Sequence, residues 1–477
     1  MPNATSPQAL QPDQPLHLQI YERLRALILQ GSMAPGSRAP SLRALAVELG
    51  VARGTVEAAY DRLVGEGYLV TRGPAGTFVA AHAALATRAA ARRETAPQRR
   101  GTAAAKTPTL EEAGTPLALQ LGLPALDEFP RKLWARLTAR QARLEGSLTR
   151  PAPAGHPRLR EALADYLHRS RGLNARAEQV FIVPGYAAAL GLCVDAVLRA
   201  GDAAWVECPG YPTSARVLTQ LGLKPVPVPV DDDGLDVSTA IRRSPQARLA
   251  VVTPSHQSPT GVSMTLARRQ ALLAWAAGAN AWVLEDDYDG EYRYRGHPLP
   301  ALKSLDLNDR VVYCGTLSKV LFPGLKLAYL VVPQAQQGLF EAASQRALHG
   351  GCPDLQQAVV ADFILEGHFA RHIKRMRTLY ARRRGYLAEA LMHQRALPLT
   401  VEMREGGMHL LARLPDGSDD LALQQRARQA GFALQALSAW SGGDRRQRGL
   451  LLSFTNVASA AQARRLCERL MAALAPA

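Results

Sequence analysis

Cysteine is scarce in this chain of 477 residues, and long apolar runs are missing. The five cysteines are scattered, with no C-x-x-C pair and no cluster of histidines, which excludes a disulfide framework and argues against a metal site. No apolar run reaches the roughly 18 residues that a membrane-spanning helix needs, and the first residues lack the basic-then-apolar pattern of a secretion signal. These absences favour a cytoplasmic protein without a membrane partner.

Acidic residues are also in deficit, since 41 Asp and Glu stand against 57 Lys and Arg, a net charge of +16. A chain this basic favours a polyanionic partner. The excess is uneven: residues 81–110 hold six basic residues and one acid among Ala, Thr and Pro, whereas residues 1–80 have a net charge of only +1. A segment with so few large apolar side chains cannot offset the entropy of ordering. Residues 81–115 are therefore predicted to be a flexible basic linker.

Before this linker, residues 14–80 have the pattern of a winged helix-turn-helix domain. Apolar residues at helical spacing predict three helices, with Gly50 in the tight turn between the second and the third. Two β-prone runs, 68–71 and 77–79, flank a Gly- and Pro-rich loop and predict a hairpin. The alternative is a generic three-helix domain that binds protein.

Side chains in this domain favour DNA as its partner. Arg53 and Thr55 lie at the start of the third helix, the end that enters the major groove in helix-turn-helix proteins. The start of the second helix suits a phosphate, and an arginine in the hairpin loop would reach the minor groove or the backbone. The predicted DNA-binding residues are Arg38, Ser41, Arg43, Arg53, Thr55, Arg72 and Gly76.

Residues 116–477 have the pattern of an α/β domain with a mostly parallel sheet, in which short apolar runs alternate with helical stretches. The domain is predicted to divide into a large lobe, about 155–340, and a smaller C-terminal lobe, about 350–477. Polar segments follow most of the apolar runs, and ligands bind beyond the carboxyl ends of strands in such sheets. The runs are 180–183, 204–206, 249–252, 281–284, 311–313 and 327–332.

These polar segments contain the groups that pyridoxal 5'-phosphate (PLP) needs, namely an amine for a Schiff base, a carboxylate at the ring nitrogen and a nest for the phosphate. Lys319 supplies the amine, Asp286 the carboxylate, and Tyr288 a hydrogen bond to the phenolic oxygen. Tyr211 would stack on the ring. The other predicted cofactor contacts are Tyr186, Ala187, Thr316, Ser318 and Lys326, with Gln257 or Ser258 at the phenolic oxygen.

Two groups of motifs resemble known families. Segments 36–43, 49–56 and 76–79 resemble the GntR family of bacterial regulators. Segments 286–289 and 315–319 resemble fold-type I aminotransferases, and the two halves together are similar to the MocR subfamily, in which a winged helix is tethered to an aminotransferase-like body. The resemblance implies a head-to-tail, domain-swapped homodimer that grips a double-stranded DNA operator.

Near the C-terminus the chain departs from the aminotransferase pattern. Leu451 stands where those enzymes hold the substrate carboxylate with an arginine, and the spacing of Arg448 fits poorly. We therefore expect no efficient transamination, although residual activity is compatible with the motifs. The run Arg382-Arg383-Arg384 is interpreted as a solvated or dimer-edge surface.

The preferred interpretation is a PLP-dependent DNA-binding transcriptional regulator that senses PLP or an amine or amino-acid-type effector, with vitamin B6 or amine metabolism as its field of control. The alternative is an aminotransferase that carries a DNA-binding head. The sequence leaves the effector, the operator and the target genes open.

Overall fold

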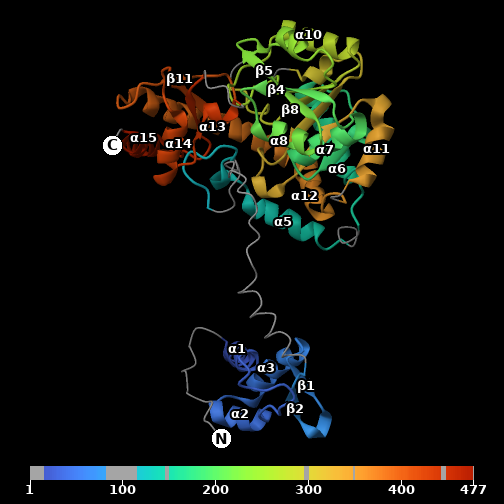
Figure 1. Ribbon diagram of the computed structural model, residues 1–477, viewed down its shortest axis with the longest axis vertical. Helices are drawn as coiled ribbons and strands as arrows, with labels where there is room; N and C mark the ends of the chain where they lie inside the picture. The colour runs from blue at the N-terminus through green and yellow to red at the C-terminus, as the bar shows by residue number, and fades with distance from the viewer. Residues whose placement is uncertain are drawn as a thin grey trace. The chain divides into compact units, whose positions relative to one another are not determined.

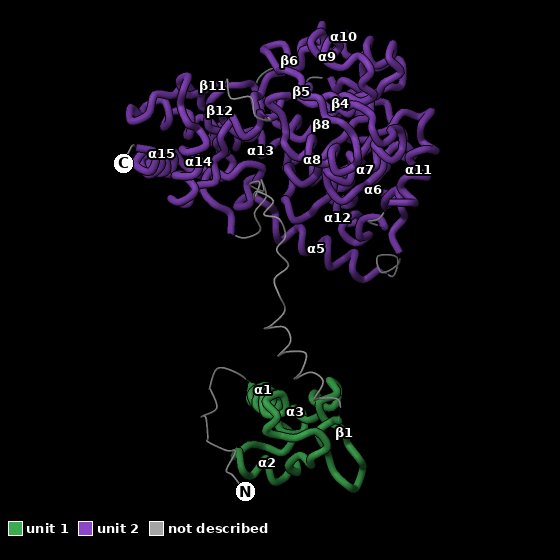
Figure 2. Tube along the Cα trace, viewed as in Figure 1, with its two compact units in different colours: residues 1–109 green, residues 110–477 purple. Residues whose placement is uncertain are grey.

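The computed structural model describes residues 15–81, 115–144, 150–294, 300–347, 350–441 and 447–475. The chain divides into two compact units, residues 1–109 and 110–477, each of which is described by itself (Figure 2). The predicted linker, residues 81–115, lies outside the described residues except for its two end positions. Among the helices of the described ranges, none combines the length and the apolar character that crossing a bilayer requires.

The first unit contains three helices around one apolar core, followed by a hairpin, as predicted (Figure 1). Ser41 caps the second helix, because its hydroxyl accepts a hydrogen bond from the backbone N–H of Ala44 at 3.2 Å. Gly50 ends that helix in the left-handed region, with φ of +66°. The elements are α1 (Leu16–Leu29), α2 (Leu42–Leu49), α3 (Arg53–Gly65), β1 (Leu69–Thr71), the 3-10 turn η1 (Gly73–Ala75) and β2 (Thr77–Val79).

An eight-stranded sheet forms the centre of the second unit, in the order β3-β10-β9-β8-β7-β4-β5-β6. The sheet is mostly parallel, as predicted, but β10, from the run 327–332, lies antiparallel to both β3 and β9. Its apolar pattern could not reveal this, because a central strand is buried on both faces in either direction. The strands are β3 (Val180–Val183), β4 (Ala203–Cys208), β5 (Lys224–Asp231), β6 (Gly234–Leu235), β7 (Leu249–Val252), β8 (Trp282–Asp287), β9 (Val311–Thr316) and β10 (Ala328–Val331).

Helices cover both faces of this sheet (Figure 1). Trp282 and Leu284 of β8 share a core cluster with α7, α8 and α11, whereas Val283 lies in a cluster with α9 and α10 on the opposite face. Because side chains alternate along a strand, Asp286 points to the α7 face and Asp287 to the other. The helices are α5 (Arg131–Gln141), α6 (Pro157–Arg171), α7 (Tyr186–Val197), α8 (Pro212–Gln220), α9 (Val237–Arg243), α10 (Leu266–Gly278), α11 (Gln337–Arg346) and α12 (Asp354–Leu365).

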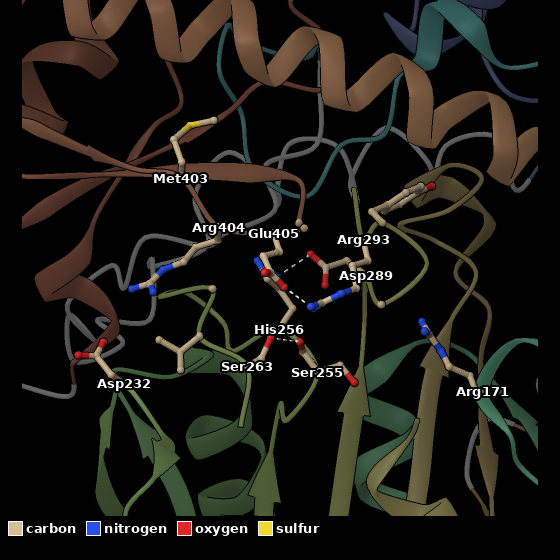
Figure 3. Close-up of a pocket in the computed structure, with 16 residues that line it drawn as sticks. Arg171, Asp232, Ser255, His256, Ser263, Asp289, Arg293, Met403, Arg404 and Glu405 are labelled. Atoms are coloured by element: carbon tan, nitrogen blue, oxygen red, sulfur yellow. Dashed lines mark hydrogen bonds and ion pairs between the residues drawn. The ribbon is translucent and has the colours of Figure 1, made fainter. Parts of the chain in front are cut away.

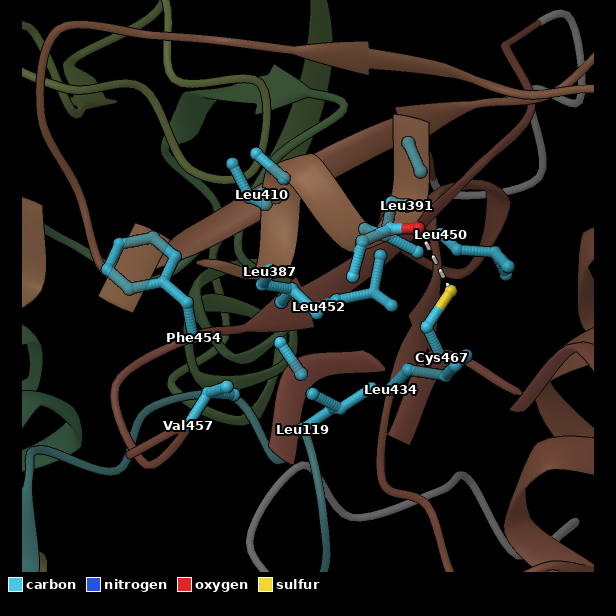
Figure 4. Close-up of a cluster of buried hydrophobic side chains, with 14 of the residues drawn as sticks. Leu119, Leu387, Leu391, Leu410, Leu434, Leu450, Leu452, Phe454, Val457 and Cys467 are labelled. Carbon is cyan, nitrogen blue, oxygen red and sulfur yellow. Dashed lines mark hydrogen bonds between the residues drawn. The ribbon is translucent and has the colours of Figure 1, made fainter. Parts of the chain in front are cut away.

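The smaller lobe packs three helices on a four-stranded antiparallel sheet, in the order β11-β12-β14-β13 (Figure 4). Leu119 and Ala125 belong to its core, although they precede the large lobe in the sequence. The backbone N–H of Ser453 donates to the Leu119 carbonyl at 3.1 Å. Residues 115–125 therefore run along the small lobe. The elements are α13 (His368–His393), β11 (Thr400–Glu402), β12 (His409–Arg413), α14 (Asp420–Gln429), β13 (Gln435–Ala436), β14 (Gly449–Ser453) and α15 (Ala460–Leu474).

Short 3-10 turns connect several of these elements. The turns are η2 (Leu126–Glu128), η4 (Ala177–Gln179), η5 (Leu302–Leu305), η6 (Pro323–Leu325), η7 (Gln334–Gln336) and η8 (Leu437–Trp440).

The interpretation of Arg382-Arg383-Arg384 as a solvated surface is wrong for two of the three residues. Arg383 is 2% exposed, and its guanidinium donates to both carboxylate oxygens of Asp127, at 3.1 and 2.5 Å. Arg384 is buried over the ring of Tyr294, 4.7 Å from its centroid. The stem of an arginine packs like an apolar side chain while its fork pairs with a carboxylate, so its charge alone did not reveal its burial.

Candidate cofactor site and DNA-binding surface

The polar segments that the sequence singles out meet at one edge of the large sheet. Strands β4, β7, β8 and β9 are parallel, so the residues that follow them lie at the same edge. The antiparallel strand β10 begins there, and the backbone N–H of Leu317 donates to the Leu327 carbonyl at 3.0 Å. The direction of β10 thus brings Lys326 back to the edge that carries Lys319.

Asp286 is a buried carboxylate at the end of β8. It is 7% exposed, and no hydrogen-bond donor from the described residues reaches its oxygens. Burial, and then the negative charges of Asp287, Glu207 and Asp289, raise the pKa of Asp286 well above its usual range, whereas the Lys319 amine lowers it. A nearby cation favours the ionised form of such a group, and the protonated ring nitrogen of PLP is one. The buried carboxylate of Asp286 therefore fits the ring nitrogen of PLP.

The neighbouring carboxylate of Asp287 is already paired. The Arg171 Nε atom lies 2.8 Å from Asp287 Oδ2, and the Tyr313 hydroxyl donates to the same oxygen at 2.7 Å. Both partners lie on the sheet face opposite Asp286. Of the two adjacent aspartates, Asp286 is therefore the one that the fold leaves for a ligand.

Two loops bring hydroxyl groups to this edge. Burial chiefly raises the pKa of Tyr288 well above its usual range, so the side chain stays a hydroxyl that can donate. In the other loop, Gln257 is fully engaged: its amide nitrogen, with two N–H bonds, lies 2.9 to 3.0 Å from three acceptors, a Glu207 carboxylate oxygen and the carbonyls of Pro209 and Ser258, and its oxygen accepts from Thr260. Gln257 is thus occupied by protein partners, and Ser258, the other predicted phenolic-oxygen contact, is buried.

The predicted ring and phosphate contacts lie on neighbouring elements. The rings of Tyr186 and Tyr211 are 5.7 Å apart, and the Tyr186 hydroxyl is 2.7 Å from Ser214 Oγ. Tyr186 and Ala187 are the first two residues of α7, where backbone N–H groups and the helix dipole favour an anion.

On the other side, the backbone N–H of Ser318 donates to Thr316 Oγ1 at 3.2 Å, which joins two of the predicted phosphate contacts. Lys326 is exposed in a left-handed backbone conformation, with φ of +52°.

Gly122 is a site residue that sequence reasoning missed. Its φ is +76°, and a Cβ atom there would lie 2.5 Å from the Lys319 Nζ atom. The small-lobe segment 115–125 therefore passes directly over the reactive amine. No local pattern signals this contact, because it joins two distant parts of the chain.

The position expected for a carboxylate-binding arginine is apolar. Leu451 is fully buried in a cluster with Leu411, Leu437 and Trp440, and Tyr211 packs against this cluster. Arg448 does not substitute for the missing arginine, since its Nη1 atom lies 3.4 Å from Asp420 Oδ1.

The first unit presents exposed arginines on α2, α3 and the hairpin: Arg43, Arg53 and Arg72. Arg53 is the first residue of α3, and Thr55, the third, is half-buried.

The chain before α2 joins the hairpin, a feature that the sequence did not predict. The backbone N–H of Ala39 donates to the Thr77 carbonyl at 2.8 Å, and the backbones of Arg38 and Phe78 form an isolated antiparallel β-bridge. A Cβ atom on Gly76 would lie 3.0 Å from the Arg38 Nε atom, so the exposed guanidinium rests on this glycine. Arg72 lies over the ring of Phe78, at 5.0 Å. The hairpin therefore carries Arg38 and Arg72 together.

Within the ranges that the structure describes, no group of three or more His, Cys, Asp or Glu side chains could hold a metal ion.

Comparison with known proteins assigns each unit to a family. Residues 16–79 match the family described as bacterial regulatory proteins, gntR family, and residues 126–470 match aminotransferase class I and II. The chain is 40% identical over 453 residues to the probable rhizopine catabolism regulatory protein MocR of Rhizobium meliloti, covering 93% of this chain and 91% of that protein. It is 35% identical to the HTH-type pyridoxine biosynthesis transcriptional regulator PdxR of Corynebacterium glutamicum, over 94% of this chain and 95% of that protein.

A solved structure is similar to the second unit. The kynurenine aminotransferase of Pyrococcus horikoshii, solved in complex with PMP, matches 76% of this chain and 91% of its own, with a TM-score of 0.68 and 27% identity.

Proposed function

Because this chain belongs to the MocR-like GntR regulators, which join a helix-turn-helix domain to an aminotransferase class I and II domain, we propose that its second unit binds PLP and that the bound state controls how the first unit holds an operator. The observation that carries the proposal is the buried Asp286 carboxylate, which has no donor among the described residues and lies near the Lys319 amine. A buried carboxylate that accepts no hydrogen bond is costly to keep ionised unless a cation, such as the protonated ring of PLP, lies beside it.

Each site residue has a distinct task in this proposal. Asp286 holds the ring nitrogen protonated, Lys319 supplies the amine that anchors the cofactor, and Tyr211 covers the ring. Tyr288 and Ser258 orient the phenolic oxygen, while the start of α7 binds the phosphate with Thr316, Ser318 and Lys326. When bound, PLP supplies an electron sink and an aldehyde carbon that reacts with amines.

The effector is PLP itself or an amine or amino-acid-type molecule that competes with Lys319 for the cofactor. The names of two relatives, one a pyridoxine biosynthesis regulator and one a probable rhizopine catabolism regulator, support vitamin B6 or amine metabolism as the field of control. We further propose that the protein acts in the cytoplasm as a homodimer with swapped heads, which places two winged helices on one DNA operator.

A transaminase is the second candidate, because the matched solved structure is an aminotransferase with 27% identity. The buried Leu451 in its apolar cluster counts against efficient turnover of amino acids, since no arginine among the described residues takes that place. Rapid multiple turnover of an amino donor with a 2-oxo acid would establish the enzyme instead.

The absorbance spectrum of the purified protein with added PLP tests the proposal. We expect a lysine-bound cofactor band in the wild type and in Lys224→Ala, which removes an exposed lysine at the start of β5, but not in Lys319→Ala. A candidate amine should then shift both the band and the affinity for promoter DNA. A wild-type spectrum equal to that of Lys319→Ala would refute the cofactor assignment.

A further inference from the structure

His256 lies between the cofactor site and the small lobe, on the loop that follows β7. The side chain is 8% exposed. Its Nδ1 atom is 3.0 Å from the Tyr288 hydroxyl and 3.1 Å from Asp289 Oδ2. One ring nitrogen therefore faces both a buried carboxylate and the tyrosine that is proposed to orient the cofactor.

The Cε1–Nε2 edge of the imidazole ring, next to Nδ1, contacts the small lobe. Gly407 has φ of +93°, and a Cβ atom there would lie 2.2 Å from His256 Cε1 and 2.6 Å from its Nε2. Only a residue without a side chain allows this approach. The small-lobe backbone at Gly407 is thus in direct contact with the ring.

Gly407 is itself tied to the segment that follows β8. Its N–H donates to the Tyr292 carbonyl at 2.9 Å, and its carbonyl accepts a hydrogen bond from the Tyr294 hydroxyl. The two lobes therefore meet at a junction that contains His256 and Gly407.

A cavity of about 290 Å³ opens beside this junction (Figure 3). Figure 3 shows His256 and Asp289 from the large lobe facing Arg404 and Glu405 from the small lobe across it. Arg293 and Glu405, which both line the cavity, form an ion pair, and the backbone of Arg293 pairs with that of Gly406. Because space remains next to the ring, a shift of the small lobe can move the imidazole instead of being blocked by close packing.

We propose that His256 is a positioning residue that couples the placement of the small lobe to Tyr288, and through Tyr288 to the phenolic oxygen of PLP. This inference rests on the proposed function. An effector that changes the small-lobe position would move Gly407 against His256, and the altered hydrogen bond would change how Tyr288 holds the cofactor. Coupling of this kind is a measurable interaction between residues.

A double-mutant cycle tests the coupling. His256→Phe keeps the ring size and removes the nitrogen, and Tyr288→Phe removes its hydroxyl partner. We expect His256→Phe alone to weaken PLP binding by about 3- to 10-fold, the range for one lost hydrogen bond, and to shift the cofactor band. In the Tyr288→Phe background the same change should have less than about a 2-fold effect. His256→Asn, whose amide nitrogen can take the place of Nδ1, should restore the wild-type band.

His409 supplies a matched control. It is a second histidine at the same junction, 6.0 Å from His256 between ring centroids, and its Nε2 atom donates to the Pro259 carbonyl at 2.9 Å. The effects of His409→Phe and Tyr288→Phe should multiply independently. Independent effects of His256→Phe and Tyr288→Phe, in variants whose apoprotein melts like the wild type, would overturn the inference.

The small-lobe contact is tested by Gly407→Ala. Its control is Gly417→Ala, since Gly417 has φ of +81° with nothing within 4 Å of its Cβ position, so both variants share the backbone strain. We expect only Gly407→Ala to shift the cofactor band, and a band equal to the control's would overturn the small-lobe part. If the wild type shows no Lys319-dependent band, the proposed function itself fails; if the band is present and the cycle shows no coupling, only the role of His256 fails.

Discussion

Glu285 makes the second unit sensitive to pH in a direction that the structure sets. This side chain on β8 is fully buried, and its two carboxylate oxygens accept from the backbone N–H groups of Leu302 and Lys303 at 2.7 and 2.8 Å. Burial, with help from the charge of Asp287, raises the pKa of Glu285 from 4.5 to about 7, although the two N–H groups lower it. The folded state therefore binds a proton that the unfolded state has released.

The sign and size of the effect follow from linkage. Below pH 4.5 the Glu285 carboxyl is neutral in both the folded and the unfolded state, so it does not lower the free energy of unfolding. As the pH rises from there through about 7, the unfolded chain releases the proton first and the folded protein loses stability. A pKa difference of one corresponds to about 1.4 kcal/mol, so the complete loss is about 3 kcal/mol, of which about 2.5 kcal/mol falls between about pH 5 and pH 8.

Glu285→Gln isolates this contribution. The glutamine amide does not titrate, so its contribution to stability does not change with pH. Its NH₂ group faces a backbone N–H, and this lowers the stability of the variant by roughly 1–3 kcal/mol at every pH. Urea unfolding of the apoprotein, followed by tryptophan fluorescence, should show the stability of the wild type falling by about 2.5 kcal/mol relative to the variant from about pH 5 to pH 8, so that the gap changes sign and the variant is the more stable protein at pH 8. Glu341→Gln, an exposed glutamate on α11, is the control. A gap that stays constant with pH would refute the reasoning.

Three further predictions concern the effector and the DNA. Leucine and 3-methylbutylamine share a side chain, and only leucine carries a carboxylate. Because Leu451 stands where an arginine would bind that carboxylate, the apparent affinities of the two for the PLP-loaded protein should agree within about 3-fold. A charge-assisted clamp would instead favour leucine by roughly 10-fold or more, and such a preference would contradict the assignment of Leu451 to that position. Arg43→Ala should reduce the salt dependence of operator binding by about 1.8 in slope, if each head of a dimer loses one phosphate contact, while leaving sequence preference intact. Arg53→Ala should instead cost about 1–3 kcal/mol on the specific operator and little on random DNA, and equal losses on both DNAs would remove Arg53 from base recognition.

Local sequence features were enough to predict the winged helix and to propose PLP as the cofactor. A serine that caps, a glycine that ends a helix and apolar residues at helical spacing act within a few residues, so the α2 turn and the hairpin could be predicted from them. Lys319 and Asp286 were predicted as site residues for a related reason: each follows an apolar run, and strand ends in an α/β sheet converge on one edge.

The tertiary structure decided which of these residues lie in contact. The direction of β10, which returns Lys326 to the edge, is hidden because strands buried on both faces look alike in either direction. Only the fold shows Gly122 over Lys319, Gly407 against His256 and the paired Arg383 inside the small lobe. Composition and periodicity thus determined the folding units of this protein and its candidate reactive groups, whereas contacts between distant segments depend on how the lobes pack, which no local pattern encodes.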